Sequence, residues 1–335
     1  MTNVNEAQQT QAVVEGNWLR PAATGTLREP RWGHPDGLQL GLDPAHGPRG
    51  LMRLYAPYLD HPRDRLVNFV AIEPIPAGAT VRGYSEMETS GLDGVQGLRF
   101  WSADDASDPT PGDALGPSRG VLTVLDGVER LEVNILSEPF ANGSDVWVRA
   151  TFRSDRPHEV SLETFARSSS VALESCILSA TMGNWARLRV LQLAEREVSS
   201  GQLWPEYRGT AFTGHARFGV DELRAAGGEV AVSAFPDEAN PSAAEYAAQT
   251  AEGWHYVGHP AVQTWRAQDP DPQLFAQVNG RFSYWMSDAP IPGGISFEDF
   301  ELVGPGRQGR SFTFAVEPLN AAGPQPVPQV AETLP

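Results

Sequence analysis

Short apolar runs broken by turn residues fill most of this 335-residue chain. The clearest run spans 145–153, where every second residue is apolar: Val146, Val148, Ala150 and Phe152. Strict alternation indicates a half-buried strand, because successive side chains of a strand point to opposite faces of the sheet. The 33 glycines and 28 prolines of the chain supply turns between such runs. The pattern predicts an all-β protein, a large antiparallel β-sandwich with one or two short helices.

Helix signals occur in two places. Residues 240–252 combine Ser242 and Glu245 at the spacing of a capping box with a proline in the first turn and a glycine after the end. A shorter helix is predicted over 221–226. Everything else between the chain ends predicts strand and turn.

The domain organisation follows from where these patterns begin and end. We expect a β-sandwich domain over 31–318, either as one body or as two packed sub-domains. Residues 1–30 are predicted to be a disordered or extended segment. Residues 319–335 are rich in proline and alanine without periodicity, which predicts a disordered tail.

The chain contains no lysine, and all 25 of its basic residues are arginine. A Schiff base, a phosphate-loop lysine and a Ser–Lys pair each need an amine that can lose its proton, which a guanidinium does not do. The sequence also lacks the Gly-x-x-x-x-Gly-Lys phosphate loop. The chemistry that remains is that of carboxylates, histidine, tyrosine, serine or a metal.

A formal net charge of −17 opposes binding to nucleic acid, whose phosphates carry the same sign. No apolar run reaches the length of a membrane span, so no membrane partner is expected. The N-terminal residues lack the pattern of a secretory leader. We therefore expect a soluble protein, cytoplasmic unless a leader was removed, in which case secreted or periplasmic. The one cysteine, Cys176, is predicted to be a buried, inert thiol.

Aromatic residues and arginines recur together along the predicted strands of the second half. Flat rings suit the C–H faces of a sugar, and guanidinium groups suit its hydroxyls or carboxylates. The alternative is that the nine tryptophans fill a wide core with arginines at its rim. The predicted substrate-binding residues are Trp147, Arg149, Trp185, Arg187, Trp254, Tyr256, Arg281, Tyr284 and Trp285.

Two carboxylates are candidates for acid–base chemistry. Glu73 ends a nearly continuous apolar run, and apolar neighbours raise the proton affinity of a carboxylate, as a general acid requires. Glu298 lies in the acidic run 297–302 and is the candidate partner. A pair of carboxylates at a suitable separation cleaves a glycosidic bond. The alternative role for either residue is a salt bridge to arginine.

Histidines are the other candidates for proton transfer, and the sequence suggests His61 and His259 for this role. His255 and His259 share one side of an extended segment, but no third metal ligand lies at a usual spacing. We therefore predict no transition-metal site and no cofactor. Calcium is the one alternative, in an oxygen-rich loop that contains Asp104, Asp105, Asp108 and Asp113.

Two segments resemble carbohydrate-active β-sandwich proteins. Residues 278–302, with Pro292-Gly293-Gly294 before the strand-like run Ile295 to Leu302, resemble the closing strands of the concanavalin-A-like and jelly-roll kind. Residues 155–160 resemble a turn-to-strand passage of galactose-mutarotase-like sandwiches. The resemblance implies a fold and a substrate class, and it transfers no catalytic residue.

These patterns together predict a carbohydrate-active enzyme whose partner is an oligosaccharide or polysaccharide. The simplest form is a glycoside hydrolase with Glu73 as general acid. A second form is a polysaccharide lyase, in which arginine neutralises a uronate and histidine or tyrosine moves the proton. A third is a non-catalytic carbohydrate-binding sandwich. The sequence leaves the sugar, the linkage and the oligomeric state open.

Overall fold

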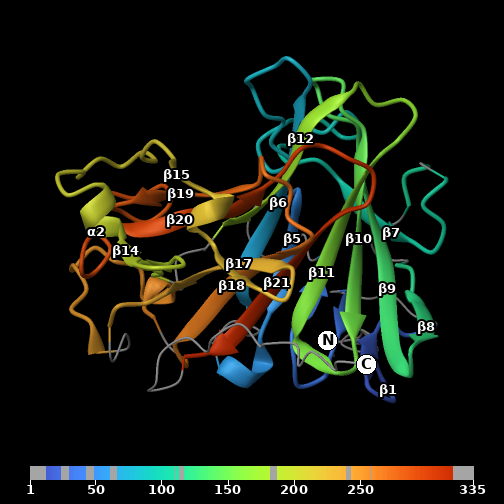
Figure 1. The fold of residues 1–335 in the computed structure, drawn as a ribbon, viewed down its shortest axis with the longest axis horizontal. Helices are drawn as coiled ribbons and strands as arrows, with labels where there is room; N and C mark the ends of the chain where they lie inside the picture. The colour runs from blue at the N-terminus through green and yellow to red at the C-terminus, as the bar shows by residue number, and fades with distance from the viewer. Residues whose placement is uncertain are drawn as a thin grey trace, which may run out of the picture. The chain divides into compact units, whose positions relative to one another are not determined.

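The computed structural model of the protein is nearly all β, as predicted. Its strands form two antiparallel sheets, accompanied in the described residues by one short α-helix and a few 3-10 turns (Figure 1). The structure describes residues 13–23, 30–42, 49–60, 66–108, 110–112, 117–181, 187–238, 243–256 and 258–319.

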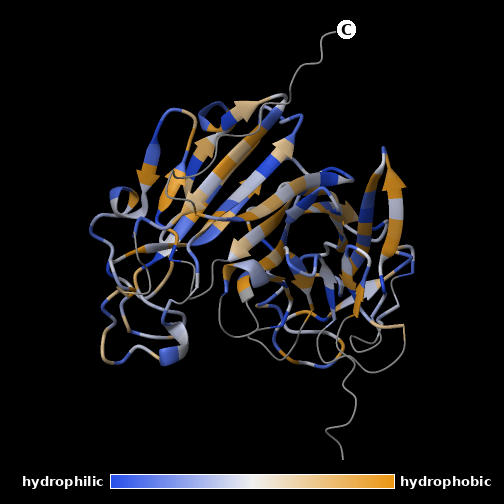
Figure 2. Cartoon of the chain, turned by 90° about the horizontal axis from the view of Figure 1, so that it is seen from below, coloured by the Kyte–Doolittle hydropathy of each residue, from blue (hydrophilic) through white to orange (hydrophobic). Residues whose placement is uncertain are grey.

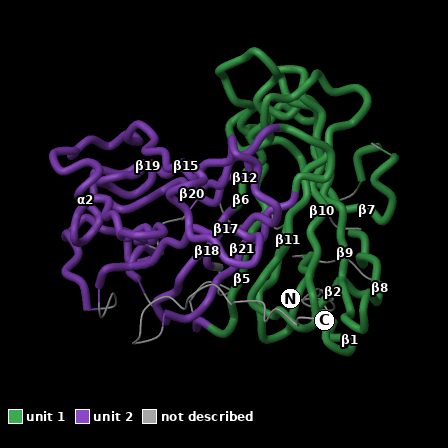
Figure 3. Tube along the Cα trace, viewed as in Figure 1, with its two compact units in different colours: residues 1–58, 70–176, 306–310 green, residues 59–69, 177–305, 311–335 purple. Residues whose placement is uncertain are grey.

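The chain divides into two compact units (Figure 3). Unit 1 comprises residues 1–58, 70–176 and 306–310, and unit 2 comprises residues 59–69, 177–305 and 311–335. Three strands cross the boundary along the chain: β6 (Leu66–Pro76), β12 (Leu173–Thr181) and β21 (Arg310–Pro318).

Unit 1 contains strands of both sheets. One sheet contributes β1 (Val13–Glu15), β2 (Trp18–Arg20), β3 (Arg31–Gly33), β4 (Gln39–Gly41) and β5 (Leu51–Tyr55), paired in that order. The other contributes β7 (Phe100–Ala103), β8 (Val121–Leu125), β9 (Val128–Ser137), β10 (Val146–Arg153) and β11 (Arg156–Ala166). A 3-10 turn, η1 (Pro57–Leu59), follows β5.

The strands of unit 1 alternate in burial as the sequence predicts. On β10, Val146, Val148, Ala150 and Phe152 are buried, and the residues between them are partly exposed. Figure 2 shows the same alternation as bands of apolar and polar residues along many strands. Gly33 on β3 lets the sheets approach closely, because a Cβ there would lie 3.1 Å from the Phe152 ring and 2.3 Å from the Leu38 carbonyl.

Unit 2 repeats this two-layer arrangement. One layer holds β15 (Ala216–Gly219), β19 (Phe275–Arg281), β20 (Ser296–Val303) and the end of β12. The other holds β13 (Val190–Gln192), β14 (Glu197–Ser199), β16 (Arg224–Ala226), β17 (Glu229–Phe235), β18 (Ala261–Gln268) and most of β21. The layers meet at the buried Trp265 of β18, whose indole N–H donates to the Phe300 carbonyl of β20 at 2.9 Å.

The predicted helices are wrong in the described residues. Residues 243–251 form no α-helix, and only a 3-10 turn, η4 (Glu252–Trp254), is present near the predicted end. Tertiary contacts of Tyr246 with His255 and Tyr256 replace the regular backbone bonds that local propensity favours. The segment predicted as a second helix is a 3-10 turn, η2 (Val220–Glu222), followed by β16.

The one α-helix of the described residues was not predicted. It is α2 (Ser200–Leu203), and it begins with a capping box. The Ser199 side chain accepts from the Gln202 N–H, and the Gln202 side chain accepts from the Ser199 N–H. The Ser-x-x-Gln spacing was therefore the sequence signal that could have predicted this helix.

Candidate functional site

Two buried arginines of unit 2 meet two acidic residues where β13 and β17 pair. Val190 lies opposite Phe235 in the antiparallel register, so residues just before β13 face residues just after β17. The Arg189 guanidinium lies 3.0 Å from Asp237 and 2.9 Å from Glu238. Arg187 lies 3.5 Å from Glu238. The register of one strand pair thus creates an ion-pair network in which the arginines are buried and the acidic side chains are partly exposed.

Tyrosine rings surround the Arg187 guanidinium. Its central carbon lies 5.1 Å from the centroid of the Tyr256 ring and 5.5 Å from that of Tyr246, which is cation–π distance. The Tyr256 N–H donates to the Tyr246 hydroxyl at 2.5 Å. The Tyr256 hydroxyl donates to the His259 carbonyl at 3.1 Å.

Burial raises the pKa of Tyr256 and of Tyr284 above the ordinary tyrosine value. In each case desolvation of the phenolate is the main cause, and the charge of Arg187 partly offsets it. Both hydroxyls therefore stay protonated at neutral pH. They can donate hydrogen bonds, but they are poor general bases.

Tyr284 joins this cluster to a second aromatic layer. Its ring stacks on Trp254 at a centroid distance of 5.0 Å, with Ala289 and Ile291 in the same apolar cluster. The following turn closes on Arg189, whose guanidinium donates to the Pro292 carbonyl. Gly293, at φ +79°, is required there because a Cβ would lie 2.7 Å from the same guanidinium.

Arg281 on β19 and Glu298 on β20 form a buried pair beside Tyr284. The Arg281 guanidinium lies 3.5 Å from a Glu298 carboxylate oxygen and donates to the Tyr284 carbonyl at 3.0 Å. Burial raises the pKa of Glu298 to about 7, the Arg281 charge lowers it, and the Asp299 charge raises it further. The Glu298 side chain is 9% exposed. Glu298 is thus a carboxyl that exchanges its proton near neutral pH.

Two exposed aromatic rings contact the same arginine. The Arg281 guanidinium carbon lies 5.2 Å from the Phe212 ring centroid and 5.1 Å from that of Trp285. The two rings are 6.1 Å apart, and the residues are 43% and 40% exposed. We call Phe212 and Trp285 the aromatic platform. It places apolar ring faces in solvent next to the Arg281–Glu298 pair.

We expect the raised pKa of Glu298 to make folding stability depend on pH. The folded state holds this proton more tightly than the unfolded chain, whose glutamates have the ordinary value of 4.5. The stabilisation is therefore complete below about pH 4.5 and is lost as the pH rises through about 7. Relative to Glu298→Gln, wild-type stability should fall by about 3 kcal/mol across that window, at 1.36 kcal/mol per pKa unit.

Urea unfolding of both proteins at several pH values between 4.5 and 8 measures this difference. Because the two chains share every other titrating group, subtraction isolates Glu298. A difference that stays flat across the window would show that Glu298 ionises at an ordinary pKa.

The structure brings seven of the predicted residues into this connected region of unit 2: Arg187, Trp254, Tyr256, Arg281, Tyr284, Trp285 and Glu298. His259 contributes its carbonyl, and its residue is exposed. The predicted residues His61 and Trp185 lie outside the described residues. The prediction of substrate binding by the set remains a prediction.

Trp147, Arg149 and Glu73 belong to unit 1. Trp147 stacks on Phe165 at 4.2 Å, and Arg149 packs against both rings and lies 3.7 Å from Glu163. These side chains form a ladder across the surface of β10 and β11, which stabilises the strand pair.

Glu73 is buried and lies 2.5 Å from the Arg82 guanidinium. A cation at this distance favours the ionised carboxylate, whereas a general acid must hold its proton. The burial of Cys176 and the nearby Glu73 charge raise the pKa of that thiol to about 12, which leaves it protonated and unreactive.

The sequence interpretation missed Asp237, Glu238, Tyr246 and Phe212. The available signal for the two acids was the Pro-Asp-Glu run directly after the apolar residues that form β17. Phe212 and Tyr246 lie in irregular segments, so no periodic pattern marked them.

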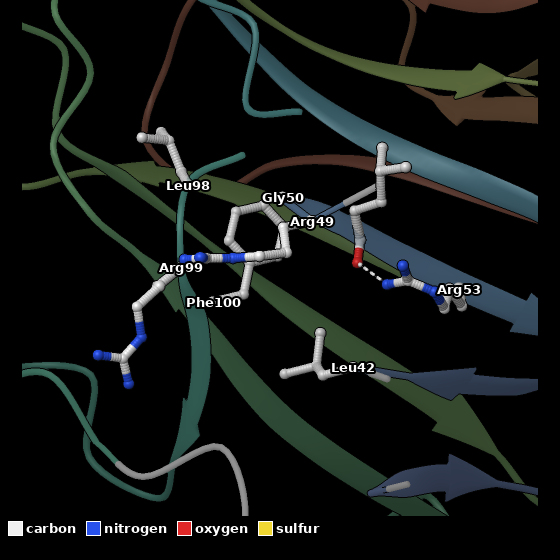
Figure 4. Close-up of a pocket in the computed structure, with 8 residues that line it drawn as sticks. Leu42, Arg49, Gly50, Arg53, Leu98, Arg99 and Phe100 are labelled. Atoms are coloured by element: carbon white, nitrogen blue, oxygen red, sulfur yellow. Dashed lines mark hydrogen bonds between the residues drawn. The ribbon is translucent and has the colours of Figure 1, made fainter. Parts of the chain in front are cut away.

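Unit 1 has a pocket of about 240 Å³ that sequence reasoning did not anticipate (Figure 4). Apolar side chains line it together with three arginines, of which Arg49 is paired with Asp93 at 2.9 Å and Arg53 donates to the Leu51 carbonyl at 3.2 Å. The lining residues are Leu42, Arg49, Gly50, Leu51, Arg53, Leu98, Arg99 and Phe100. None of the predicted site residues is among them.

The acidic loop proposed for calcium is described in part. Asp105 and Asp108 accept from the backbone N–H groups of Ser107 and Thr110. Bonds from the backbone and hydroxyl of Ser107 lower the pKa of Asp105, and bonds from the hydroxyl and backbone of Thr110 lower the pKa of Asp108. In such turns each carboxylate accepts a hydrogen bond from a backbone N–H group two residues further along the chain. Asp113 lies outside the described residues, and calcium binding remains a prediction.

Comparisons with known proteins give little help. No protein-family model matches the sequence, and no curated protein matches it. A solved structure from Klebsiella pneumoniae subsp. pneumoniae MGH 78578, of a protein proposed to be an aldose 1-epimerase, aligns over 86% of this chain and 79% of its own. The TM-score is 0.26 and the identity 11%, so this likeness carries no conclusion about fold or function. Among the described residues no helix is long and apolar enough to span a membrane.

Proposed function

We propose that unit 2 binds a carbohydrate on the aromatic platform and that Glu298 acts as general acid in cleaving a glycosidic bond. The observation that carries this proposal is that Arg281 contacts both platform rings and also Glu298. One guanidinium thus joins a surface suited to sugar stacking with a protonatable carboxyl.

The platform supports the binding step. Two large rings that remain about 40% exposed in a folded unit present apolar area to solvent, and the C–H face of a sugar ring would cover it. Their flat faces suit the apolar face of a pyranose ring.

The environment of Glu298 supports the acid step. A glycosidic oxygen must receive a proton as the bond breaks, while water adds to the anomeric carbon. A carboxyl with a pKa of about 7 is about half protonated at neutral pH, so it can supply that proton. Burial supplies that shift for Glu298, and a hydrophobic pocket does the same for the general acid of lysozyme. In this proposal the general acid is Glu298 and not Glu73, which is paired with Arg82.

The lyase alternative has weaker support. It places a tyrosine or histidine as base beside an arginine, and Tyr256 does lie over Arg187. However, burial raises the pKa of Tyr256, which makes it a poor base. The non-catalytic alternative keeps the aromatic platform as a binding surface and gives Glu298 only a structural role.

We expect Trp285→Ala to weaken saccharide binding about 5- to 150-fold. The substitution removes stacking contact of roughly 1–3 kcal/mol, the burial value of a large apolar side chain, and each 1.4 kcal/mol corresponds to a factor of ten. Isothermal titration with oligosaccharides that bind the wild type measures the change.

Tyr84→Ala is the matched control, because Tyr84 is also 40% exposed but belongs to unit 1. Its affinity should equal that of the wild type. Equal loss in both variants, or no loss in Trp285→Ala, would remove the platform from the proposal.

A further inference from the structure

Three potential metal ligands converge on the polar face of the β15–β19–β20 layer in unit 2, where these strands lie side by side (Figure 1). His215, Asp299 and Glu301 each offer one ligand atom, and these atoms all lie within 4.8 Å of one another. None of the three was among the predicted site residues.

The strand registers explain why these residues meet. Ala216 lies opposite Val278, so His215 comes directly before the paired part of β15 and next to Asn279. Gln277 lies opposite Glu301, and Thr181 opposite Asp299. Four neighbouring strands, β12, β20, β19 and β15, therefore bring polar residues to one patch of one face.

Neighbouring side chains orient both carboxylates. The Asn279 amide donates to Asp299 Oδ2 at 2.6 Å, and the Thr181 hydroxyl donates to Asp299 Oδ1 at 3.2 Å. The Gln277 amide donates to Glu301 Oε2. Hydrogen bonds of this kind fix the direction of carboxylates that ligate metals, and they are typical of a second coordination layer.

Burial adds an independent observation. Glu301 is 0% exposed. Ser179 is also 0% exposed, and its hydroxyl makes no hydrogen bond with the described residues. Continuing the β12–β20 register by two residues places Ser179 opposite Glu301, on the face that Thr181 shares with Asp299. A buried oxygen without a partner thus faces the cluster.

We propose that His215, Asp299 and Glu301 bind one divalent transition-metal ion, with the Ser179 hydroxyl as a further oxygen donor. An imidazole with two carboxylates suits zinc or manganese, whereas calcium and magnesium prefer sites made of oxygen alone. This site differs from the His255–His259 pair and from the acidic loop around Asp104.

Titration of chelator-treated, dialysed protein with zinc chloride, and separately with manganese chloride, tests the proposal. We expect one ion bound per chain and a rise in melting temperature, because a ligand that binds only the folded state stabilises it. His215→Ala should weaken the affinity at least about a hundredfold, the upper end of what loss of a second-layer partner causes. His215 is exposed, so this variant should fold normally.

His158→Ala in unit 1 is the control and should bind the ion as the wild type does. Glu301→Gln, checked for folding by circular dichroism, should also lose the affinity. The proposal is overturned if neither ion binds at a one-to-one ratio, or if His215→Ala binds as tightly as His158→Ala. Trp285→Ala should retain metal binding, so a failure of the carbohydrate proposal would remain distinct from a failure of this one.

Discussion

Glu298→Gln is expected to lower turnover of a cleaved polysaccharide by at least about a hundredfold and by as much as about ten-thousandfold. This range is what a positioned general acid contributes, and glutamine keeps the shape of the side chain while removing its proton. Because the protonated form is active, wild-type activity should decline as the pH rises above about 7. Initial rates with measured kcat and KM test both expectations.

Glu197→Gln is the matched control, since Glu197 is an exposed glutamate of the same unit on β14. It should retain wild-type turnover. The KM of Glu298→Gln should change little, because the platform that binds the sugar is intact. If Glu298→Gln turns over substrate at the wild-type rate, Glu298 is a structural acid and the mechanism is wrong.

Trp265→Ala is expected to destabilise the protein by about 3–5 kcal/mol, the usual range for removing a large aromatic side chain from a core. Trp265 is fully buried, packs against Phe312 and Phe314, and donates a hydrogen bond to the Phe300 carbonyl. Alanine leaves a cavity and an unsatisfied carbonyl between the two layers of unit 2. Urea unfolding followed by circular dichroism measures the loss.

The same substitution at Trp285 provides the comparison. Trp285 is 40% exposed, so Trp285→Ala should destabilise the protein by less than about 1 kcal/mol. Equal destabilisation in the two variants would show that Trp285 is a core residue, and it would count against the aromatic platform.

The β class and many strand positions could be predicted because alternation is a local property of the sequence. The predicted run 145–153 matches β10. Short strands such as β3 and β4 escaped prediction, since three residues carry too little periodicity. The helix predicted over 240–252 failed in its described part because side-chain contacts of Tyr246 outweighed local propensity.

The sequence indicated which residue types the candidate site contains, but it did not indicate which of these residues meet. Residue type alone marked Arg281, Trp285 and Glu298 as suited to sugar chemistry. Which residues meet depends on long-range strand pairing: the β13–β17 register brings Arg187 to Glu238, and the β19–β20 register brings Arg281 to Glu298. Glu73 lies in a strand of mainly apolar residues, which suggested a general acid. Its partner Arg82 lies in a segment without periodicity, so the sequence did not predict this ion pair.

Incubating the protein with a panel of purified polysaccharides tests the central claim most directly, with new reducing ends and the ultraviolet absorbance of unsaturated products as readouts. The account predicts that at least one polysaccharide yields reducing ends without unsaturation, and that Glu298→Gln still binds this substrate without cleaving it. Unsaturated products would instead indicate a lyase. If the protein neither cleaves nor binds any member of the panel, the assignment of unit 2 as a carbohydrate site is contradicted.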